Sequence, residues 1–304
     1  MLPPLKPLSS SLDLQGAFAQ LSRKGFAGGS LDETLRQLTA ATGRILDIER
    51  ASLWGLTAQR ATLECIDLYE LSRNRHSSGV TLHAAHYPEY FRALARGEPI
   101  VADNALVHPC TQEFADHYLL MNGISAVINS PIHVNGDLQG VLCIERVGPH
   151  SAWTSMQRLF AQAIASLVSL ALLQSQLVVV EGELRDANNL RRALFTGARD
   201  AIVISDGHTG HILDANPQAE RLFGRRVQQL LGVLQSELHA AGDDRQVREL
   251  CTLRGKAEKG EAVRGEVVNG DGRLVPVEMT GQVVQLEQGK KIFQGVFRPL
   301  DRPV

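Results

Sequence analysis

The chain has few cysteines and almost no net charge. Its four cysteines lie far apart and form no Cys-x-x-Cys pair, which excludes a disulfide framework and a zinc ribbon. A formal net charge of -2 at pH 7 provides no broad basic surface for nucleic acid or for an anionic membrane. We therefore expect small molecules or proteins as partners, and neither nucleic acid nor a membrane.

Long uninterrupted apolar runs are also missing. The first eleven residues carry a single charge, Lys6, and no continuous apolar segment, so no signal peptide is predicted. The longest apolar stretch, near residues 167–180, is interrupted by Ser169 and by the polar residues 174–176. The sequence therefore predicts a cytoplasmic protein.

Apolar residues make up 44% of the 304 residues, enough for a hydrophobic core in each of two domains. The order of expected strands and helices predicts an α+β fold, with two antiparallel-sheet domains joined by a long helix. The expected segments are a leader with a short helix at 1–29, a first domain at 30–172, a linker helix at 173–194 and a second domain at 195–304.

Local signals support this division. Ser30 and Glu33 have the spacing of a capping box at the start of a helix. Asn135-Gly136 lies between two alternating apolar segments and predicts a hairpin with a type I′ turn. We also expect a short helix ending near residue 23 and a longer helix over residues 243–259.

An apolar seam with heptad spacing lies between the two domains. Its members occupy the a and d positions of one register: Leu170, Leu173, Leu177, Val180, Leu184, Ala187 and Leu194. Such a seam is typical of a helix that pairs with a partner helix, and it predicts a coiled-coil homodimer. The alternative is an ordinary amphipathic helix whose apolar stripe packs against the chain's own domains.

Two known families account for most of the chain. Residues 30–172 resemble a GAF domain in element order and in four local pieces: Arg50-Ala-Ser-Leu-Trp54, Tyr87-Pro-Glu-Tyr-Phe91, Gly140-Val-Leu-Cys-Ile-Glu145 and Trp153-Thr154. Residues 190–298 resemble a PAS domain in four further pieces: Asp200–Asp206, Asp214–Gly224, Val275–Glu278 and Gly295–Phe297. Both families are sensor folds in which helices surround a pocket on one face of an antiparallel sheet.

The resemblance implies a sensory and dimerisation module of a bacterial signal-transduction protein. Such a module binds a small ligand or a partner and relays a conformational change to an output domain, such as a diguanylate cyclase, a phosphodiesterase or a histidine kinase. The chain contains none of the output signatures of these enzymes, so we expect no catalytic activity in it. It is either a regulatory partner protein or the sensory part of a longer parent.

The expected pocket wall in the first domain consists of aromatic, imidazole and small apolar side chains: Trp54, His86, Tyr87, Phe91, Phe114, Ile128 and Cys143. The same residue types also fill ordinary cores, so a scaffold without ligand is one alternative. Another is a GAF-type thiol enzyme similar to the free methionine sulfoxide reductases, which needs a thiolate nucleophile and a resolving thiol. The chain lacks the cysteine-glycine pocket motif of that family.

Metal and cofactor signals are weak. The candidate ligands are scattered histidines and one cysteine: His83, His86, His108, Cys110 and His239. Only His83 and His86 have a regular i, i+3 spacing, and we interpret the group as a polar loop region rather than as a metal centre. No motif supports haem or flavin, and the sequence names no cofactor.

Overall fold

The computed structural model describes residues 29–57, 59–239, 255, 261–286 and 289–300. The helix expected before residue 23 lies outside them, and of the helix expected over 243–259 they include only Gly255, which is helical. The chain divides into two compact units between Glu181 and Gly182, and each is described by itself.

The first unit is built on an antiparallel sheet whose strands follow the order β3-β2-β1-β7-β6-β5, with β4 also paired to β2. The strand bounds are β1 (Arg50–Leu56), β2 (Thr62–Glu70), β3 (Arg75–Ser77), β4 (Thr81–His83), β5 (Ile100–Ala102), β6 (Ile124–Val134) and β7 (Asp137–Val147). Asn135 and Gly136 both have positive φ, at 53° and 86°, as a type I′ turn requires. The predicted hairpin of β6 and β7 is thereby confirmed.

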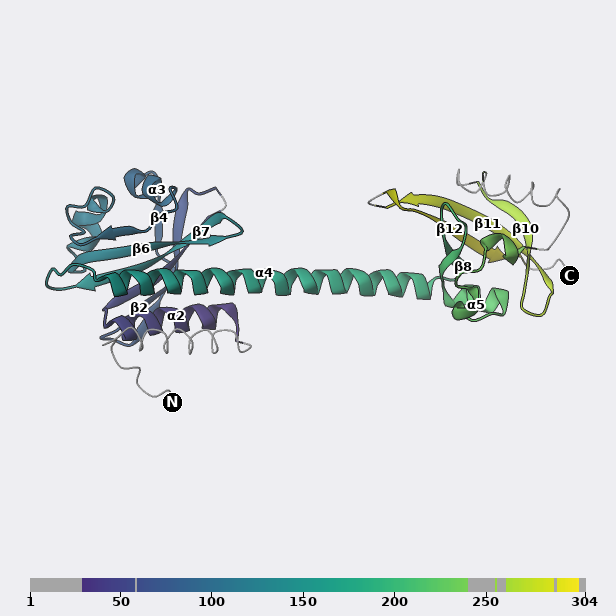
Figure 1. The fold of residues 1–304 in the computed structure, drawn as a ribbon, viewed down its shortest axis with the longest axis horizontal. Coiled ribbons are helices and arrows are strands. Elements are labelled where there is room, and N and C mark those ends of the chain that lie inside the picture. Colours follow the sequence, from purple (N-terminus) through teal and green to yellow (C-terminus); the bar gives the residue numbers. More distant parts are fainter. Residues whose placement is uncertain (1–28, 58, 240–254, 256–260, 287–288, 301–304) are drawn as a thin grey trace. The chain divides into compact units, whose positions relative to one another are not determined.

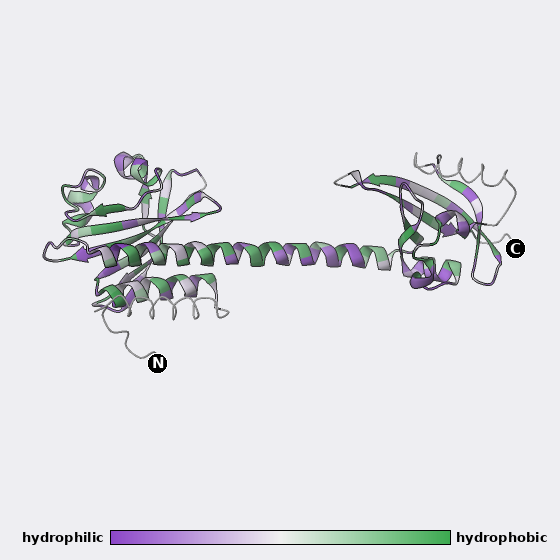
Figure 2. Ribbon diagram, in the orientation of Figure 1, coloured by the Kyte–Doolittle hydropathy of each residue, from purple (hydrophilic) through white to green (hydrophobic). Residues whose placement is uncertain are grey.

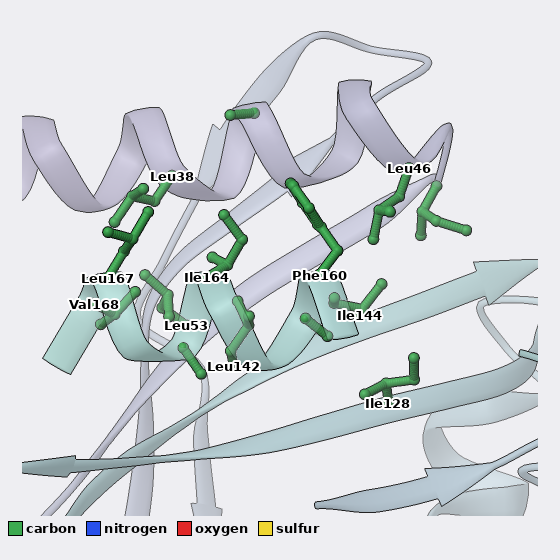
Figure 3. Packing of buried hydrophobic residues seen from close by; sticks show 14 of the residues in the cluster. Leu38, Leu46, Leu53, Ile128, Leu142, Ile144, Phe160, Ile164, Leu167 and Val168 are labelled. Carbon is green, nitrogen blue, oxygen red and sulfur yellow. The ribbon is translucent and has the colours of Figure 1, made fainter. Parts of the chain in front are cut away.

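Two helices cover one face of this sheet, α2 (Leu31–Leu46) and the first part of α4 (Ser155–Gly197). The Ser30 side chain accepts a hydrogen bond from the Glu33 amide at the start of α2, as the capping box predicts. Figure 3 shows the core between the helices and the sheet, where Phe160 and Ile164 from α4 face Leu142 and Ile144 from β7. Below, this side of the sheet is called the helix face.

The opposite face is covered by α3 (Pro88–Leu94) and by the connection between β5 and β6 (Figure 1), which contains η1 (Gln112–Phe114) and η2 (Ala115–Leu119). We call residues 103–123 the covering segment and this side of the sheet the cavity face. A bulge in β2 places Leu53 opposite Asp67 but Trp54 opposite Cys65, so Ile66 is the extra residue. The bulge lets Cys65 share the cavity face with Trp54.

The second unit is a five-stranded antiparallel sheet in the order β10-β11-β12-β8-β9. Its strands are β8 (Ala201–Asp206), β9 (Ile212–Ala215), β10 (Val263–Val268), β11 (Leu274–Gln285) and β12 (Lys291–Pro299), and its helices are α5 (Pro217–Phe223), α6 (Val227–Leu230) and η3 (Gln235–Leu238). The fully buried Asn216 accepts from the Ala219 amide and so caps α5. The Phe223 and Phe297 rings meet edge to face at 5.5 Å in the core.

The predicted fold class is confirmed, because two antiparallel sheets are joined by the continuous helix α4. Helix α4 extends from Ser155 to Gly197, so it contains the expected linker at 173–194 and, before it, a helix of the first domain's core. Apolar residues continue along α4 well beyond the part that packs on the sheet (Figure 2).

Most seam residues of α4 are exposed in the part of the chain that the structure describes. Five of them are between 49% and 67% exposed: Leu170, Leu177, Val180, Leu184 and Leu194. Leu173 is half-buried and Ala187 is exposed. The coiled-coil dimer and the stripe packed on the chain's own domains therefore both stay predictions.

By length and composition, α4 could also cross a membrane, and within the described residues no other helix meets both criteria. This is weak evidence for a membrane span, because core helices of soluble proteins meet the same criteria. Seven apolar residues near its N-terminal end are buried on the helix face: Phe160, Ala161, Ile164, Ala165, Leu167, Val168 and Ala171. Packing in the first domain therefore accounts for part of its apolar character.

Candidate ligand-binding site

A cavity of about 60 Å³ lies on the cavity face of the first domain. The sheet contributes its floor, and α3, β4 and the covering segment close it. Val80 is 56% exposed, so the cavity reaches solvent beside it. The residues around it are Trp54, Val80, Leu82, Tyr90, Thr111, Phe114, Tyr118, Leu119, Val127, Asn129, Cys143 and Glu145.

Aromatic rings form much of the wall, and their neighbours fix their positions. The Trp54 indole donates from Nε1 to the Ser52 hydroxyl at 2.9 Å. The ring of Phe114 stands at 86° to that of Tyr90, with 4.9 Å between centroids, and at 66° to that of Tyr118, with 6.5 Å between centroids. The wall therefore presents aromatic surfaces in several directions.

One carboxylate, Glu145, belongs to the wall and is held by a buried network. Its oxygens accept from Arg50 Nε at 2.8 Å and from the Tyr118 hydroxyl at 2.8 Å. Arg50 also donates to Glu70 at 3.3 Å, and the side chains of all three charged residues are at most 10% exposed. Because Tyr118 belongs to the covering segment, this network ties that segment to the sheet.

A second polar group of the wall consists of Asn129, Tyr90 and Cys143. Asn129 donates from Nδ2 to the Tyr90 hydroxyl at 3.1 Å, and that hydroxyl lies 3.8 Å from Cys143 Sγ. Burial raises the pKa of both Tyr90 and Cys143 well above the ordinary values, and the negative charge of Glu145 raises both further. Both groups therefore stay protonated near neutral pH.

Two thiols of the first domain, those of Cys65 and Cys143, are poor nucleophiles. Burial raises the pKa of Cys65 to about 12, with added contributions from the charges of Asp67 and Glu145. Cys65 and Cys143 are both buried and free, and Cys110 is half-buried. Since the thiolate is the reactive form, these environments oppose thiol chemistry at Cys65 and Cys143.

The covering segment is also bonded to the start of α4. Asp103, its first residue, accepts from the Trp153 amide at 2.8 Å and lies 3.5 Å from Arg158. Arg146 follows Glu145 in β7, and its guanidinium lies 4.7 Å from the centre of the Trp153 ring. The covering segment and the start of α4 thus share direct contacts, made by Asp103 rather than by a residue of the cavity wall.

The structure brings together some of the predicted wall residues. Trp54, Phe114 and Cys143 line the cavity. Tyr87 stacks on Phe114 at 4.3 Å, outside the lining residues, and Phe91 is packed at the edge of the same cluster. His86 is exposed.

Ile128 lies away from the cavity, on the helix face in the core of Figure 3. Side chains alternate along β6, so Val127 and Asn129 face the cavity and Ile128 between them cannot. Sequence reasoning missed Tyr90, Tyr118, Asn129 and Glu145. Tyr90 and Glu145 are part of the quoted GAF-like pieces, but nothing local in the sequence separates them from ordinary core residues.

The weak metal candidates lie on loops and strand ends. The His83 and His86 rings are 5.8 Å apart, His108 Nδ1 accepts from the Cys110 amide, and His239 in the second unit lies 3.4 Å from the Glu266 carbonyl. Burial lowers the pKa of His239. Across the described ranges, no three His, Cys, Asp or Glu side chains are grouped closely enough to hold a metal ion.

Comparison with known families matches both halves of the chain. The GAF domain model matches residues 30–172, and the PAS fold model matches residues 189–300. No curated protein matches the chain.

Several solved structures are similar to parts of the chain. The GAF domain of a phosphoenolpyruvate-protein phosphotransferase from Coxiella burnetii is 15% identical with a TM-score of 0.47, covering 57% of this chain and 99% of its own. The phycocyanobilin-bound GAF domain of a cyanobacterial phytochrome is 16% identical with a TM-score of 0.47, covering 55% and 98%. The PAS domain of an HTR-like protein from Haloarcula marismortui is 24% identical with a TM-score of 0.34, covering 40% and 97%.

Proposed function

Because the chain consists of a GAF domain followed by a PAS domain, we propose that it is the non-catalytic sensory and dimerisation module of a bacterial signal-transduction protein. Both are sensory domains found in signalling proteins. In this proposal a small ligand enters the GAF cavity and favours one arrangement of the covering segment. A ligand drives such a change only through different affinities for the two arrangements.

The contact between the covering segment and α4 is the observation that carries the proposal. A ligand that displaces Tyr118 also disturbs the segment that begins at Asp103. Asp103 accepts from the Trp153 amide and pairs with Arg158, so the displacement reaches the first turn of α4. Helix α4 then carries the change to the PAS domain.

Dimerisation through α4 is the second part of the proposal. Five seam residues are 49–67% exposed, and full burial of an aliphatic side chain contributes about 1.5–3 kcal/mol. A parallel coiled coil of two copies would bury this stripe and place two identical modules side by side. We further propose a cytoplasmic location and an output domain or partner protein beyond the PAS domain.

The raised thiol pKa values favour this role over a GAF-type thiol enzyme, since Cys65 and Cys143 hold their protons near neutral pH. A scaffold without ligand remains as the second candidate. It predicts that no small molecule copurifies with the chain, which native mass spectrometry tests.

The dimer is tested by light scattering on the chain with Leu177 and Leu184 both changed to Glu. We expect the native chain to be a dimer and this variant a monomer. Val178→Glu with Val179→Glu is the matched control, because both valines are 63% and 57% exposed but lie outside the a and d positions. A native monomer at high concentration, or dissociation by the control as well, would contradict the proposal.

A further inference from the structure

The described side chains that line the cavity carry only negative charge. Among the described residues that line it, Glu145 is a carboxylate and none is Lys, Arg or His. Arg50 is not one of the lining residues, but it donates to Glu145 at 2.8 Å and to the hydroxyl of the lining Tyr118 at 3.2 Å. A carboxylate or phosphate ligand would find no positive side chain in this wall and would face the Glu145 charge.

The field of Glu145 extends across the cavity. Beyond the larger effect of burial, its charge raises the pKa of Cys143 in the same strand, β7, and it adds to the larger contribution of Cys143 at Tyr90 in α3. At the Tyr118 hydroxyl, burial and the charge of Glu145 raise the pKa, whereas the charge of Arg50 lowers it. The lining side chains, which include Glu145 and no cation, therefore favour a positive over a negative guest, and Arg50 offsets part of the Glu145 charge from outside the lining.

The aromatic wall adds a second attraction for a cation. Trp54, Tyr90, Phe114 and Tyr118 all line the cavity, and the rings of Tyr90 and Phe114 are nearly perpendicular. Aromatic faces attract cations, and the attraction reaches about 2 kcal/mol when the pair is shielded from water. Trp gives the strongest effect.

We infer that the GAF cavity binds a small methylated ammonium ion, with the rings of Trp54, Phe114 and Tyr118 around it and Glu145 as its counter-charge. This inference rests on the proposed sensory role of the cavity and names the chemical class of its ligand.

The size of the cavity requires the covering segment to move. A dry cavity of about 150 Å³ accepts benzene, with its six heavy atoms. The 60 Å³ present here is too small for the five heavy atoms of tetramethylammonium. Outward movement of Phe114 and Tyr118 supplies the missing space and releases Glu145 from the Tyr118 hydroxyl, so that the carboxylate faces the ion.

The test is calorimetric titration of the full chain with tetramethylammonium, tert-butanol and pivalate, which have similar shapes and carry positive, zero and negative charge. We expect tetramethylammonium to bind at least tenfold more tightly than the other two. Equal binding of tert-butanol would overturn the ammonium assignment, as would the absence of tetramethylammonium binding. Both results are independent of the light-scattering measurement of the dimer, so the proposed sensory and dimerisation role is tested separately.

Two variants locate the effect. Glu145→Gln should weaken tetramethylammonium binding about tenfold. Glu70→Gln is the matched control, because Glu70 also pairs with Arg50 but lies outside the cavity, and it should change this binding less than about twofold. Phe114→Leu keeps an apolar side chain and loses the ring, so it should weaken binding of the cation about tenfold and leave tert-butanol unchanged. If Glu145→Gln does not fold, Phe114→Leu alone tests the inference. Unchanged tetramethylammonium binding in both variants would overturn the inference.

Discussion

The two faces of the GAF sheet are made from alternate residues of the same strands, yet they are packed in different ways. In β7, Leu142 and Ile144 point to α2 and α4 and are fully buried among aliphatic side chains and Phe160. Cys143 and Glu145 point to the other face, where aromatic rings, a buried ion pair and a cavity replace close aliphatic packing. Close packing resists change, whereas a face with a cavity and breakable hydrogen bonds can adopt a second arrangement.

The largest loss of stability should come from a substitution that creates a cavity on the helix face. Phe160→Ala removes a fully buried ring of α4 and should lower the free energy of unfolding by about 3–5 kcal/mol, measured by urea denaturation. Leu159→Ala is the matched control, because Leu159 is 64% exposed, and it should change stability by less than about 0.5 kcal/mol. Similar losses of stability in Phe160→Ala and Leu159→Ala would contradict the claim that the helix face is the closely packed one.

A smaller effect is expected on the cavity face. Tyr118→Phe removes the hydroxyl that donates to Glu145 and keeps the ring, so we expect a loss of about 1.5–3 kcal/mol in urea denaturation. Tyr87→Phe serves as the control, since its ring stacks on Phe114 while no hydrogen bond of its hydroxyl is found within the described residues. Equal stability of Tyr118→Phe and the native chain would mean that the covering segment is not held by this contact.

The smallest effect concerns the thiols. In the folded chain at pH 8, an alkylating reagent should modify the half-buried Cys110 faster than Cys65 or Cys143, as peptide mass spectrometry can measure. The pKa of Cys65 is raised from about 9 to about 12, so the folded state retains a proton that the unfolded state loses. Cys65 therefore contributes to a fall in stability as the pH rises through this interval. Rapid labelling of Cys65 at pH 8 would contradict its buried environment and its raised pKa, and would support the thiol-enzyme alternative.

The sequence was sufficient for features encoded by neighbouring residues. The capping box at Ser30 and the turn at Asn135-Gly136 predict local geometry that the structure has. The heptad seam predicts an unsatisfied apolar stripe, and four of its five leucines are exposed within the described residues. Each of these signals depends on spacings of a few residues.

The cavity could be predicted only in part, because its wall depends on contacts between distant segments. Glu145 gains its role from Arg50, 95 residues earlier in the sequence, and from Tyr118 in the covering segment. The sequence predicts Ile128 in the wall, but it lies on the helix face, because alternation along β6 does not reveal which set of side chains meets the cavity. No local sequence signal predicts the bulge at Ile66, which places Cys65 opposite Trp54.

The two faces are joined at Asp103, and this connection is the central claim of the account. Hydrogen exchange should be measured on Asp103→Ala, with Asp137→Ala as the control, because Asp137 is exposed and pairs only with the exposed Arg60 in the described part of the chain. We predict faster exchange both in residues 103–123 and in residues 153–160 at the start of α4, with no change in the control. Faster exchange confined to residues 103–123, with the start of α4 unaffected, would contradict the claim that the cavity communicates with the helix.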